Sequence, residues 1–397
     1  GHVDVVFGTH NLAHAPALLA EARRTGEPVR EPLRVPRSQE IRDAARLLAR
    51  RRQLSWRRAH GLLHDVVHVI PGEAGRAHPM YEGKPSVFDA LCVHQDEVCD
   101  LPPGAVLLAG DAGALDKAAS ELRFALTEIG FYFIVNHGVS ADQIARTFAE
   151  VKRFHAQPDE KKLALKLDHH NTGYLPLRGN TLRTSTVQSG TKANLNEAFF
   201  VKRELPADHP DVLADRRFRG LNRWPSDLPG FRETVLDYCE TMERLVQKMV
   251  RIYARALDLP AAYFDAAFQD PQYSLRMTHY PHQNGPVTDE FGLAPHTDTS
   301  FLTLLAPNDV SGLSIRTQSG EWIEAPAIPD AYVVNGGQML QRWTNDFFLA
   351  TPHRAINKSG GERYAIPFFC DSNIDWPIAA VPTTVGPDRP PQYPTTY

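Results

Sequence analysis

The sequence predicts a mixed α and β fold, with a β-barrel or jelly-roll core and an N-terminal helical half packed outside it. Two observations predict this fold class. Helical periodicity recurs between residues 113 and 257, whereas from Tyr273 onward short apolar runs alternate with turn residues. Strands at such regular spacing favour a sandwich or barrel, and helices that precede them are expected to pack on its outside. The 397 residues are 42% hydrophobic, so the chain can form a large core.

The first hundred residues differ in character from the rest. They are rich in Arg, Ala and His; residues 3–7 predict a short strand, and residues 12–24 and 38–68 predict helices. A Leu-Pro-Pro-Gly breaker at 101–104 predicts a boundary. We therefore expect three parts: an atypical segment without a catalytic role over 1–105, a helical part over 106–270, and a catalytic jelly roll over 271–397.

Periodic apolar residues predict the elements of the helical part. Residues 113–129 have helical spacing, and residues 131–135 (FYFIV) form an aromatic and β-branched run of strand length. Ser140 followed by Gln143 is a capping-box signal for a helix that continues to about residue 155. A longer helix is predicted over about 229–257. In the β part, turns are predicted at residues 284–285, 311–312, 319–320, 336–337 and 360–361.

Charge and cysteine content exclude several classes of protein. The formal net charge of −4 gives no overall attraction to nucleic acid or an anionic membrane. No apolar run approaches the roughly 20 residues that span a bilayer, and the N-terminus has no export signal. Four cysteines in a chain of this length do not indicate a disulfide framework. We expect a cytoplasmic protein with a small-molecule substrate and no nucleic-acid or membrane partner; nothing indicates an oligomeric state.

Three residues form a candidate metal site. His296 and Asp298 lie two apart in an expected extended segment, so both side chains can face one ion. Taken alone, such a pair more often lies at the surface at a strand end than in a metal site. His353 follows after enough intervening chain to return to the same end of a barrel. Two imidazoles and one carboxylate are the facial triad of non-haem Fe(II) oxygenases, which leaves coordination positions open.

Arg363 is the candidate residue for binding an anion. Strand alternation places Arg363 and Ala365 on one face of the segment that follows His353. A guanidinium that points into an apolar barrel requires an anionic partner. A dicarboxylate cosubstrate would supply one through a bidentate pair, and the alternative is an internal salt bridge to Asp or Glu.

From about residue 106 to the end, the chain resembles the isopenicillin-N-synthase-like family of 2-oxoglutarate/Fe(II)-dependent dioxygenases. Seven blocks carry the resemblance, in family order and spacing. They are 130–138 (GFYFIVNHG), 196–199 (NEAF), 275–281 (LRMTHYP), 296–298 (HTD), 335–340 (NGGQML), 352–354 (PHR) and 363–369 (RYAIPFF). Jointly these blocks are far more specific than any one of them.

The resemblance implies a fold, a chemistry and roles for particular residues. It implies a double-stranded β-helix in which His296, Asp298 and His353 bind Fe(II). Arg363 would bind the distal carboxylate of 2-oxoglutarate, and Tyr280 would hydrogen-bond this cosubstrate unless it is a core aromatic. The reaction consumes O2, releases succinate and CO2, and hydroxylates, desaturates or cyclises a small organic substrate. Tyr174 and Phe200 are candidate pocket residues, although both also suit plain core packing.

Three departures from the family pattern matter. Ala365 replaces the usual serine two residues after the arginine, which removes one hydroxyl contact worth about 1 kcal/mol. The usual Asn-x-Tyr tripeptide reads Thr278-His279-Tyr280. The sequence stops at Tyr397, where relatives continue into a C-terminal helix, so a more open pocket is expected.

Residues 1–105 lie outside this resemblance. Residues 3–34 faintly resemble part of a radical-SAM tRNA methylthiotransferase, and residues 72–109 a piece of a class I glutamine amidotransferase domain. Neither piece carries its family's chemistry, because no cysteine precedes Cys92 and that cysteine lacks a glycine-rich elbow. Two alternatives for the whole chain stay open: an Fe(II) oxidase or cyclase of the same fold that does not use 2-oxoglutarate, and an inactive metal-binding scaffold.

Overall fold

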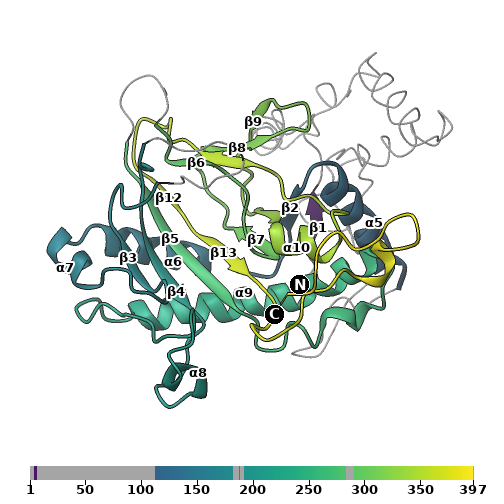
Figure 1. Cartoon of the computed structure of the whole chain (residues 1–397). Coiled ribbons are helices and arrows are strands. Elements are labelled where there is room, and N and C mark those ends of the chain that lie inside the picture. Colours follow the sequence, from purple (N-terminus) through teal and green to yellow (C-terminus); the bar gives the residue numbers. More distant parts are fainter. Residues whose placement is uncertain (1–3, 7–111, 182–186, 188–191, 283–289, 397) are drawn as a thin grey trace, which may run out of the picture.

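The computed structural model describes residues 4–6, 112–181, 187, 192–282 and 290–396 (Figure 1). The helices expected over 12–24 and 38–68 and the boundary at 101–104 lie outside the described residues. So does the turn expected at 284–285. The strand expected at 3–7 corresponds to β1 (Asp4–Val6), which pairs antiparallel with β2 (Phe131–Val135).

The larger of two antiparallel sheets has the strand order β1-β2-β10-β7-β13-β5-β4-β3, with β12 beside one end of β5. Its remaining strands are β3 (Gly173–Leu175), β4 (Glu197–Lys202), β5 (Tyr273–Tyr280), β7 (Leu302–Leu305), β10 (Tyr332–Gly336), β12 (Arg363–Ala365) and β13 (Pro367–Cys370). β12 and β13 both pair with β5, so the segment that carries Arg363 runs beside the segment that carries Tyr280.

The smaller sheet has the order β6-β11-β8-β9. Its strands are β6 (Leu293–His296), β8 (Leu313–Arg316), β9 (Trp322–Glu324) and β11 (His353–Ala355). Apolar side chains from both sheets pack together; one such cluster contains Phe131 and Ile315, and another contains Tyr280 and Ala355. Two antiparallel sheets that share an apolar interior form the jelly-roll core that the sequence predicts.

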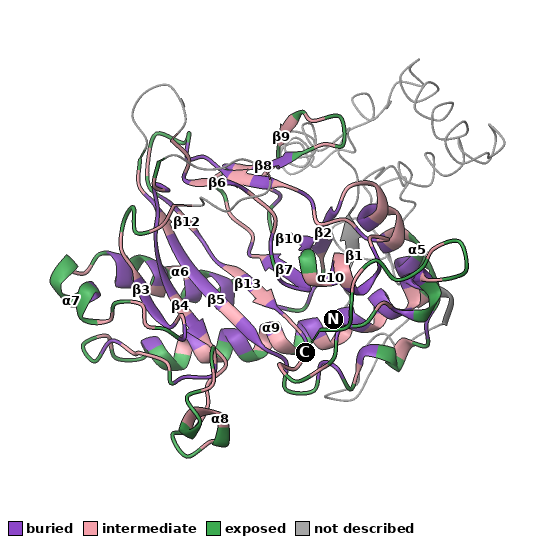
Figure 2. Cartoon of the chain, viewed as in Figure 1, coloured by how far each residue is buried: buried purple, intermediate pink, exposed green. Residues whose placement is uncertain are grey.

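Helices cover the outer face of the larger sheet (Figure 1). The helices that pack against this sheet are α5 (Ala112–Glu128), α6 (Ala141–His155) and α9 (Phe231–Ala256). The described residues also form α7 (Asp159–Ala164), α8 (Pro210–Leu213) and α10 (Gln338–Trp343), with the short 3-10 helices η2 (Ala261–Phe264) and η3 (Pro382–Thr384). The long helix α9 is purple along its buried stripe in Figure 2. Two buried tyrosine pairs tie α9 to the sheet, because Tyr253 and Tyr238 hydrogen-bond Tyr132 and Tyr332 at 2.7 and 3.0 Å.

The predicted elements of the helical part are confirmed to within two residues. β2 has the expected bounds, and α5, α6 and α9 differ from their predictions by one or two positions. Ser140 caps α6 by accepting a hydrogen bond from the Gln143 backbone N–H at 3.1 Å. The capping box is incomplete, however, because the Gln143 side chain donates to Asp237 of α9 at 2.8 Å. The glycines at 336–337 lead into α10 and do not join two strands.

None of the described helices is both long and apolar enough to cross a membrane.

Candidate metal centre

His296, Asp298 and His353 meet at one end of the smaller sheet. His296 is the last residue of β6 and pairs directly with His353, the first residue of β11. Asp298 follows two residues after β6 and places its Oδ1 atom 3.5 Å from the Nε2 atom of each histidine. One potential ligand atom from each of the three residues lies within 4.8 Å of the others. These separations allow all three atoms to contact a single cation.

Backbone carbonyls orient both imidazoles. His296 Nδ1 lies 2.8 Å from the carbonyl oxygen of Ala294, and His353 Nδ1 lies 3.1 Å from that of Thr351. Since a carbonyl oxygen only accepts, each Nδ1 carries the proton and donates. The Nε2 lone pairs are therefore free to bind a metal, which is the usual arrangement for a histidine ligand.

Two polar side chains hold the carboxylate of Asp298. Thr303 Oγ1 donates to Asp298 Oδ2 at 2.6 Å, and Asn335 Nδ2 donates to the same oxygen at 2.8 Å. Both residues are buried and pair with each other across β7 and β10. Their hydrogen bonds leave Oδ1 facing the histidines. Sequence reasoning assigned neither residue this role; the available signal was a polar residue within each of two otherwise apolar strands.

The charges of the triad depend on one another. Burial by itself raises the pKa of Asp298, but the His353 and His296 rings beside it lower that pKa well below its usual range. Burial and the neighbouring His353 lower the pKa of His296. Burial also opposes a charge on His353, yet Asp298 raises the pKa of that ring. The carboxylate is therefore ionised, and it favours positive charge on His353, where a bound cation would compete with a proton for Nε2.

Arg363 is buried and has no carboxylate within 4.0 Å among the described residues. Its Nε donates to the carbonyl of Val310 at 3.3 Å, and its guanidinium lies 4.9 Å from the ring centre of Tyr280, its partner across β12 and β5. Burial lowers the pKa of Arg363, and Tyr280 partly offsets this. The internal salt bridge considered as an alternative is therefore not found in the described part of the chain.

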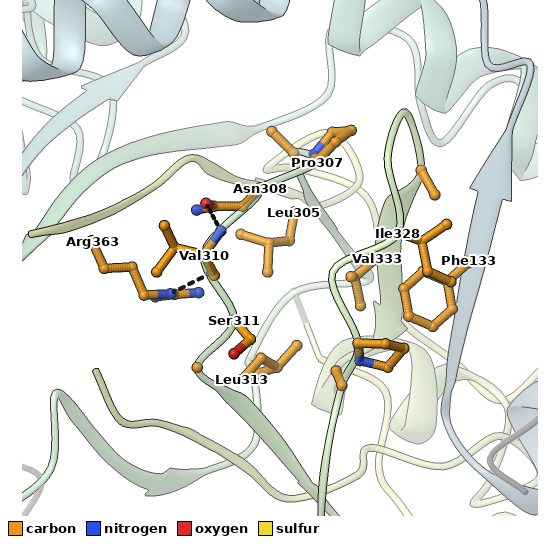
Figure 3. Close-up of a pocket in the computed structure, with 15 residues that line it drawn as sticks. Phe133, Leu305, Pro307, Asn308, Val310, Ser311, Leu313, Ile328, Val333 and Arg363 are labelled. Atoms are coloured by element: carbon orange, nitrogen blue, oxygen red, sulfur yellow. Dashed lines mark hydrogen bonds between the residues drawn. The ribbon is translucent and has the colours of Figure 1, made fainter. Parts of the chain in front are cut away.

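The side chain of Arg363 reaches a small apolar pocket between the two sheets. Figure 3 shows the guanidinium on one side of this pocket, with Leu305 and Leu313 between it and Phe133. Tyr280 packs against Ala355 and Leu293, which belong to the strands that carry His353 and His296. A guanidinium without a carboxylate partner among the described residues, in the same interior as the triad, fits the distal carboxylate of a dicarboxylate whose other end binds the metal.

Ala365 lies on the same interior face as Arg363 and is buried against Tyr280 and Ala355. A methyl group therefore occupies the place where the resemblance leads one to expect a serine hydroxyl. Tyr364 points to the opposite face of β12, where its ring stacks on His279 with centroids 4.8 Å apart.

The two candidate pocket residues, Tyr174 and Phe200, lie on opposite faces of the larger sheet. Tyr174 pairs across β3 and β4 with Phe199, shares its face and belongs to the hydrophobic core; its hydroxyl group donates to Glu197. Phe200 is half-buried on the other face, next to Arg276. The position of Tyr174 corresponds to the core-packing alternative, whereas Phe200 lies on the interior side of the sheet.

A larger cleft of about 630 Å³ opens beside the triad. It is lined by Thr297 and Thr299, which flank Asp298, and by Pro352, which precedes His353. Arg342 also lines this cleft.

Two further groups of side chains in the described residues have metal-ligand chemistry. In the first, the ammonium group of Lys162 lies 2.9 Å from the carboxylate of Glu197, which His155 and His279 also approach. That carboxylate therefore already has a cation. In the second, Asp215 lies 2.9 Å from both His169 and His170 and is largely exposed. Within the described part of the chain, the triad of His296 alone combines burial, free lone pairs and a position in the interior that also contains Arg363.

Comparisons with known proteins agree with this geometry. The sequence signature of the 2OG-Fe(II) oxygenase superfamily matches residues 271–372, and that of the non-haem dioxygenase in morphine synthesis N-terminal family matches residues 98–227. The 2-oxoglutarate-Fe(II) type oxidoreductase hxnY of Emericella nidulans is 33% identical over 292 residues, which cover 72% of this chain and 82% of that protein. The 2-oxoglutarate-dependent dioxygenase citB of Monascus ruber is 33% identical over 276 residues, covering 67% and 82%.

A solved structure shows the same likeness. The chain superimposes on a full-length Neurospora crassa protein, crystallised in complex with alpha-KG and thymine, with a TM-score of 0.64 and 25% identity, covering 73% of this chain and 90% of that chain. The alternatives of an oxidase that does not use 2-oxoglutarate and of an inactive scaffold are not favoured by these relatives. The chain belongs to the 2-oxoglutarate–Fe(II) oxygenase superfamily and is a dioxygenase that uses Fe(II), 2-oxoglutarate and O2 to oxidise a small organic substrate.

Proposed function

We propose that His296, Asp298 and His353 bind the Fe(II) ion and that Arg363, with Tyr280, binds 2-oxoglutarate. One observation carries this assignment: three ligand atoms from distant parts of the chain lie within 4.8 Å of one another, in a buried setting. The unpaired guanidinium of Arg363 on the same interior face supports the second part. With both assignments, Asp298 and Arg363 each have a partner of opposite charge.

The bound Fe(II) and 2-oxoglutarate supply the chemistry, namely activation of O2 coupled to oxidative decarboxylation of the cosubstrate to succinate and CO2. The residues of this chain supply position and charge. Thr303 and Asn335 fix the carboxylate of Asp298, and the carbonyls of Ala294 and Thr351 fix the two imidazoles. The apolar residues between the sheets exclude water from the cosubstrate.

We further propose that the substrate enters through the cleft beside Thr297 and Thr299, because this cleft borders the triad. We also propose a helical part over 106–270, a catalytic part over 271–397 and no catalytic role for residues 1–105; the signature match that begins at residue 271 supports the second boundary, whereas the other match begins at residue 98, eight residues before the first. A cytoplasmic location is supported by Cys239 and Cys370, which are both buried free thiols.

Conversion of 2-oxoglutarate to succinate tests the metal assignment. The purified chain with Fe(II) is expected to form succinate, and Asp298→Asn is expected to abolish it by removing a charged ligand. Asp215→Asn is the matched control, since Asp215 also contacts two histidines but lies at the surface. Loss of succinate formation in Asp215→Asn with retention in Asp298→Asn would move the iron site to the other cluster.

A further inference from the structure

Arg276 is a second buried guanidinium on the interior face of β5. Side chains two apart in a strand share a face, so Arg276, Thr278 and Tyr280 point to the same side. Tyr280 packs between the sheets with Ala355, and this side is therefore the interior of the jelly roll. The side chain of Phe200, which lies opposite Arg276 on β4, has the same orientation.

The contacts of Arg276 within the described residues leave most of its donors unused. Its Nη2 donates to Asn196 Oδ1 at 2.9 Å, and its guanidinium lies 5.4 Å from the ring centre of Phe200. The Nε atom is buried and has no hydrogen-bond partner among the described residues, although the whole residue is only 8% exposed. A guanidinium has five N–H donors, and a buried charge is unfavourable unless it is paired.

The other buried arginines show what a structural arginine looks like in this protein. The described residues contain three: Arg219, Arg276 and Arg363. Arg219 donates to the carboxylate of Asp211 at 2.8 Å and to the Gln272 side chain at 3.1 Å. Arg276 and Arg363 have no carboxylate within 4.0 Å among the described residues. The two unpaired guanidinia thus share one interior, where 2-oxoglutarate is proposed to satisfy Arg363.

Arg276 also lies next to the strand that carries His296. Asn196, which accepts from Arg276, donates its own Nδ2 to the carbonyl of Gly292, just before β6. Asn194, two residues earlier, accepts from the backbone N–H of Ala294 at 2.8 Å. Arg276 is close enough to Asp298 and Tyr280 for both to oppose the fall in its pKa that burial causes. A small molecule held at Arg276 can therefore reach the metal.

The charges of the interior leave one position for an anion. With Fe(II) and 2-oxoglutarate bound, the interior would hold four positive charges, two on Fe(II) and one on each guanidinium of Arg276 and Arg363. It would hold three negative charges, one on Asp298 and two on 2-oxoglutarate. Asp371, another acidic group within electrostatic range of Asp298, is balanced by Lys202. A single further carboxylate makes the loaded interior neutral.

We propose that Arg276 binds a carboxylate of the primary substrate, so that this dioxygenase acts on small organic acids. This assignment rests on the proposed function of the triad and of Arg363. Phe200 lies beside the guanidinium and offers an apolar surface to the rest of the acid, whose oxidisable C–H bond extends to the metal. Arg342 in the outer cleft is a less suitable anchor, because it is only half-buried and already donates to the Pro394 carbonyl.

The test uses matched pairs of probes on the Fe(II)–2-oxoglutarate enzyme without oxygen. Phenylacetate, 3-phenylpropionate and hexanoate are compared with their primary amides, and binding is measured from the change in the visible charge-transfer band. We expect at least one acid to bind and its amide to bind roughly 10- to 100-fold more weakly. Arg276→Gln is expected to weaken acid binding by a similar factor and so to remove the preference for acid over amide. Arg276→Lys is expected to retain part of this preference, and the control Arg342→Gln is expected to retain all of it.

Several results would overturn the proposal. Equal binding of acids and amides would do so, as would loss of acid binding in Arg342→Gln with retention in Arg276→Gln. If Arg276→Gln loses as much affinity for 2-oxoglutarate as it loses for the acid, Arg276 belongs to the cosubstrate site. By contrast, failure of the parent enzyme to bind Fe(II) and 2-oxoglutarate at all would refute the proposed function.

Thermal stability gives a second readout that does not depend on the choice of acids. Because Arg276 donates to Asn196 but has no carboxylate partner among the described residues, Arg276→Met is expected to lower the unfolding temperature of the ligand-free protein less than Arg219→Met does. Arg219→Met is the control and is expected to unfold at a lower temperature, because it leaves Asp211 with one fewer partner. If Arg276→Met loses as much stability as Arg219→Met and no acid binds the parent, Arg276 is a structural residue and the proposal is overturned.

Discussion

Asp298 depends on its neighbours for its orientation as well as for its charge. Thr303 and Asn335 occupy one carboxylate oxygen, and the two histidines face the other. Residues that hold a ligand without touching the metal typically alter metal affinity by 10- to 100-fold when removed. The arrangement therefore makes a prediction about a residue outside the triad.

Thr303→Val keeps the size of the side chain and removes the donor to Asp298. We expect the affinity for Fe(II) to fall about 10-fold or more, measured by anaerobic titration, together with succinate formation at limiting iron. The control is Thr147→Val, which removes another buried hydroxyl that donates to the backbone of α6 far from the triad. Equal iron affinity in Thr303→Val and the parent would show that Thr303 does not position the ligand.

Ala365 allows a gain of affinity to be tested. Ala365→Ser places a hydroxyl group beside Arg363 and is expected to strengthen 2-oxoglutarate binding about fivefold, since a neutral hydrogen bond contributes about 1 kcal/mol. Ala365→Val adds bulk without a donor and controls for crowding against Tyr280 and Ala355. If serine and valine weaken binding equally, space at this position and not the missing hydroxyl limits cosubstrate affinity.

Helix α6 begins at a cap whose contribution can be isolated. Ser140 is exposed, and its hydroxyl oxygen accepts from the backbone N–H of Gln143. Ser140→Ala is expected to reduce the free energy of unfolding by about 1 kcal/mol, and Ser140→Asp is expected to preserve it, because aspartate also accepts at this position. Chemical denaturation measures both. A loss in Ser140→Asp as large as that in Ser140→Ala would mean that the cap does not stabilise α6.

His279 on the outer face of β5 makes stability depend on pH. Burial by itself lowers its pKa, but hydrogen bonds to Glu197 and Glu362 raise it above 6.5. A histidine with a raised pKa stabilises the folded state fully below its unfolded pKa, and this contribution is lost as pH rises through the folded value. The parent should therefore exceed His279→Gln in stability most at pH 6 or just below, and the difference should shrink as pH is raised above 6.5.

Denaturation of both proteins at several pH values measures this trend. His282→Gln, at an exposed position nearby, controls for the loss of a histidine in general. A difference between the parent and His279→Gln that stays constant or grows above pH 6.5 would contradict the prediction.

Elements with strong local signals were predictable from sequence, whereas pairing between elements was not. The apolar run of β2 and the stripe of α9 gave bounds close to the observed ones. Tyr174 and Phe200 were grouped in one pocket, but antiparallel pairing aligns Tyr174 with Phe199. Because side chains alternate along a strand, one residue of register decides which face each occupies. The roles of Thr303 and Asn335 likewise depend on a register that the sequence does not specify.

At the scale of the molecule, the proposed site joins residues from both sheets. The triad lies at one end of the smaller sheet, and Arg363 with Tyr280 belongs to the larger one. Ligands that contact both sheets are expected to stabilise their association. A saturating ligand at 100 times its dissociation constant adds about 2.7 kcal/mol to the free energy of unfolding.

Mn(II), which does not support turnover, and 2-oxoglutarate together should therefore raise the unfolding temperature of the parent by several degrees. The rise from 2-oxoglutarate should depend on the metal, because the cosubstrate is expected to bind both Arg363 and the ion. Thermal unfolding with each ligand alone and with both measures this dependence. A full effect of 2-oxoglutarate without metal would place its binding elsewhere.

The most direct test of the metal centre is anaerobic titration of the protein with Fe(II) and 2-oxoglutarate, followed through the visible charge-transfer band. The band is expected to saturate in the parent, to be absent from His353→Ala and Asp298→Asn, and to require about 100-fold more 2-oxoglutarate in Arg363→Gln. A band of full intensity in His353→Ala, or no band in the parent, would contradict the convergence of these residues on one iron.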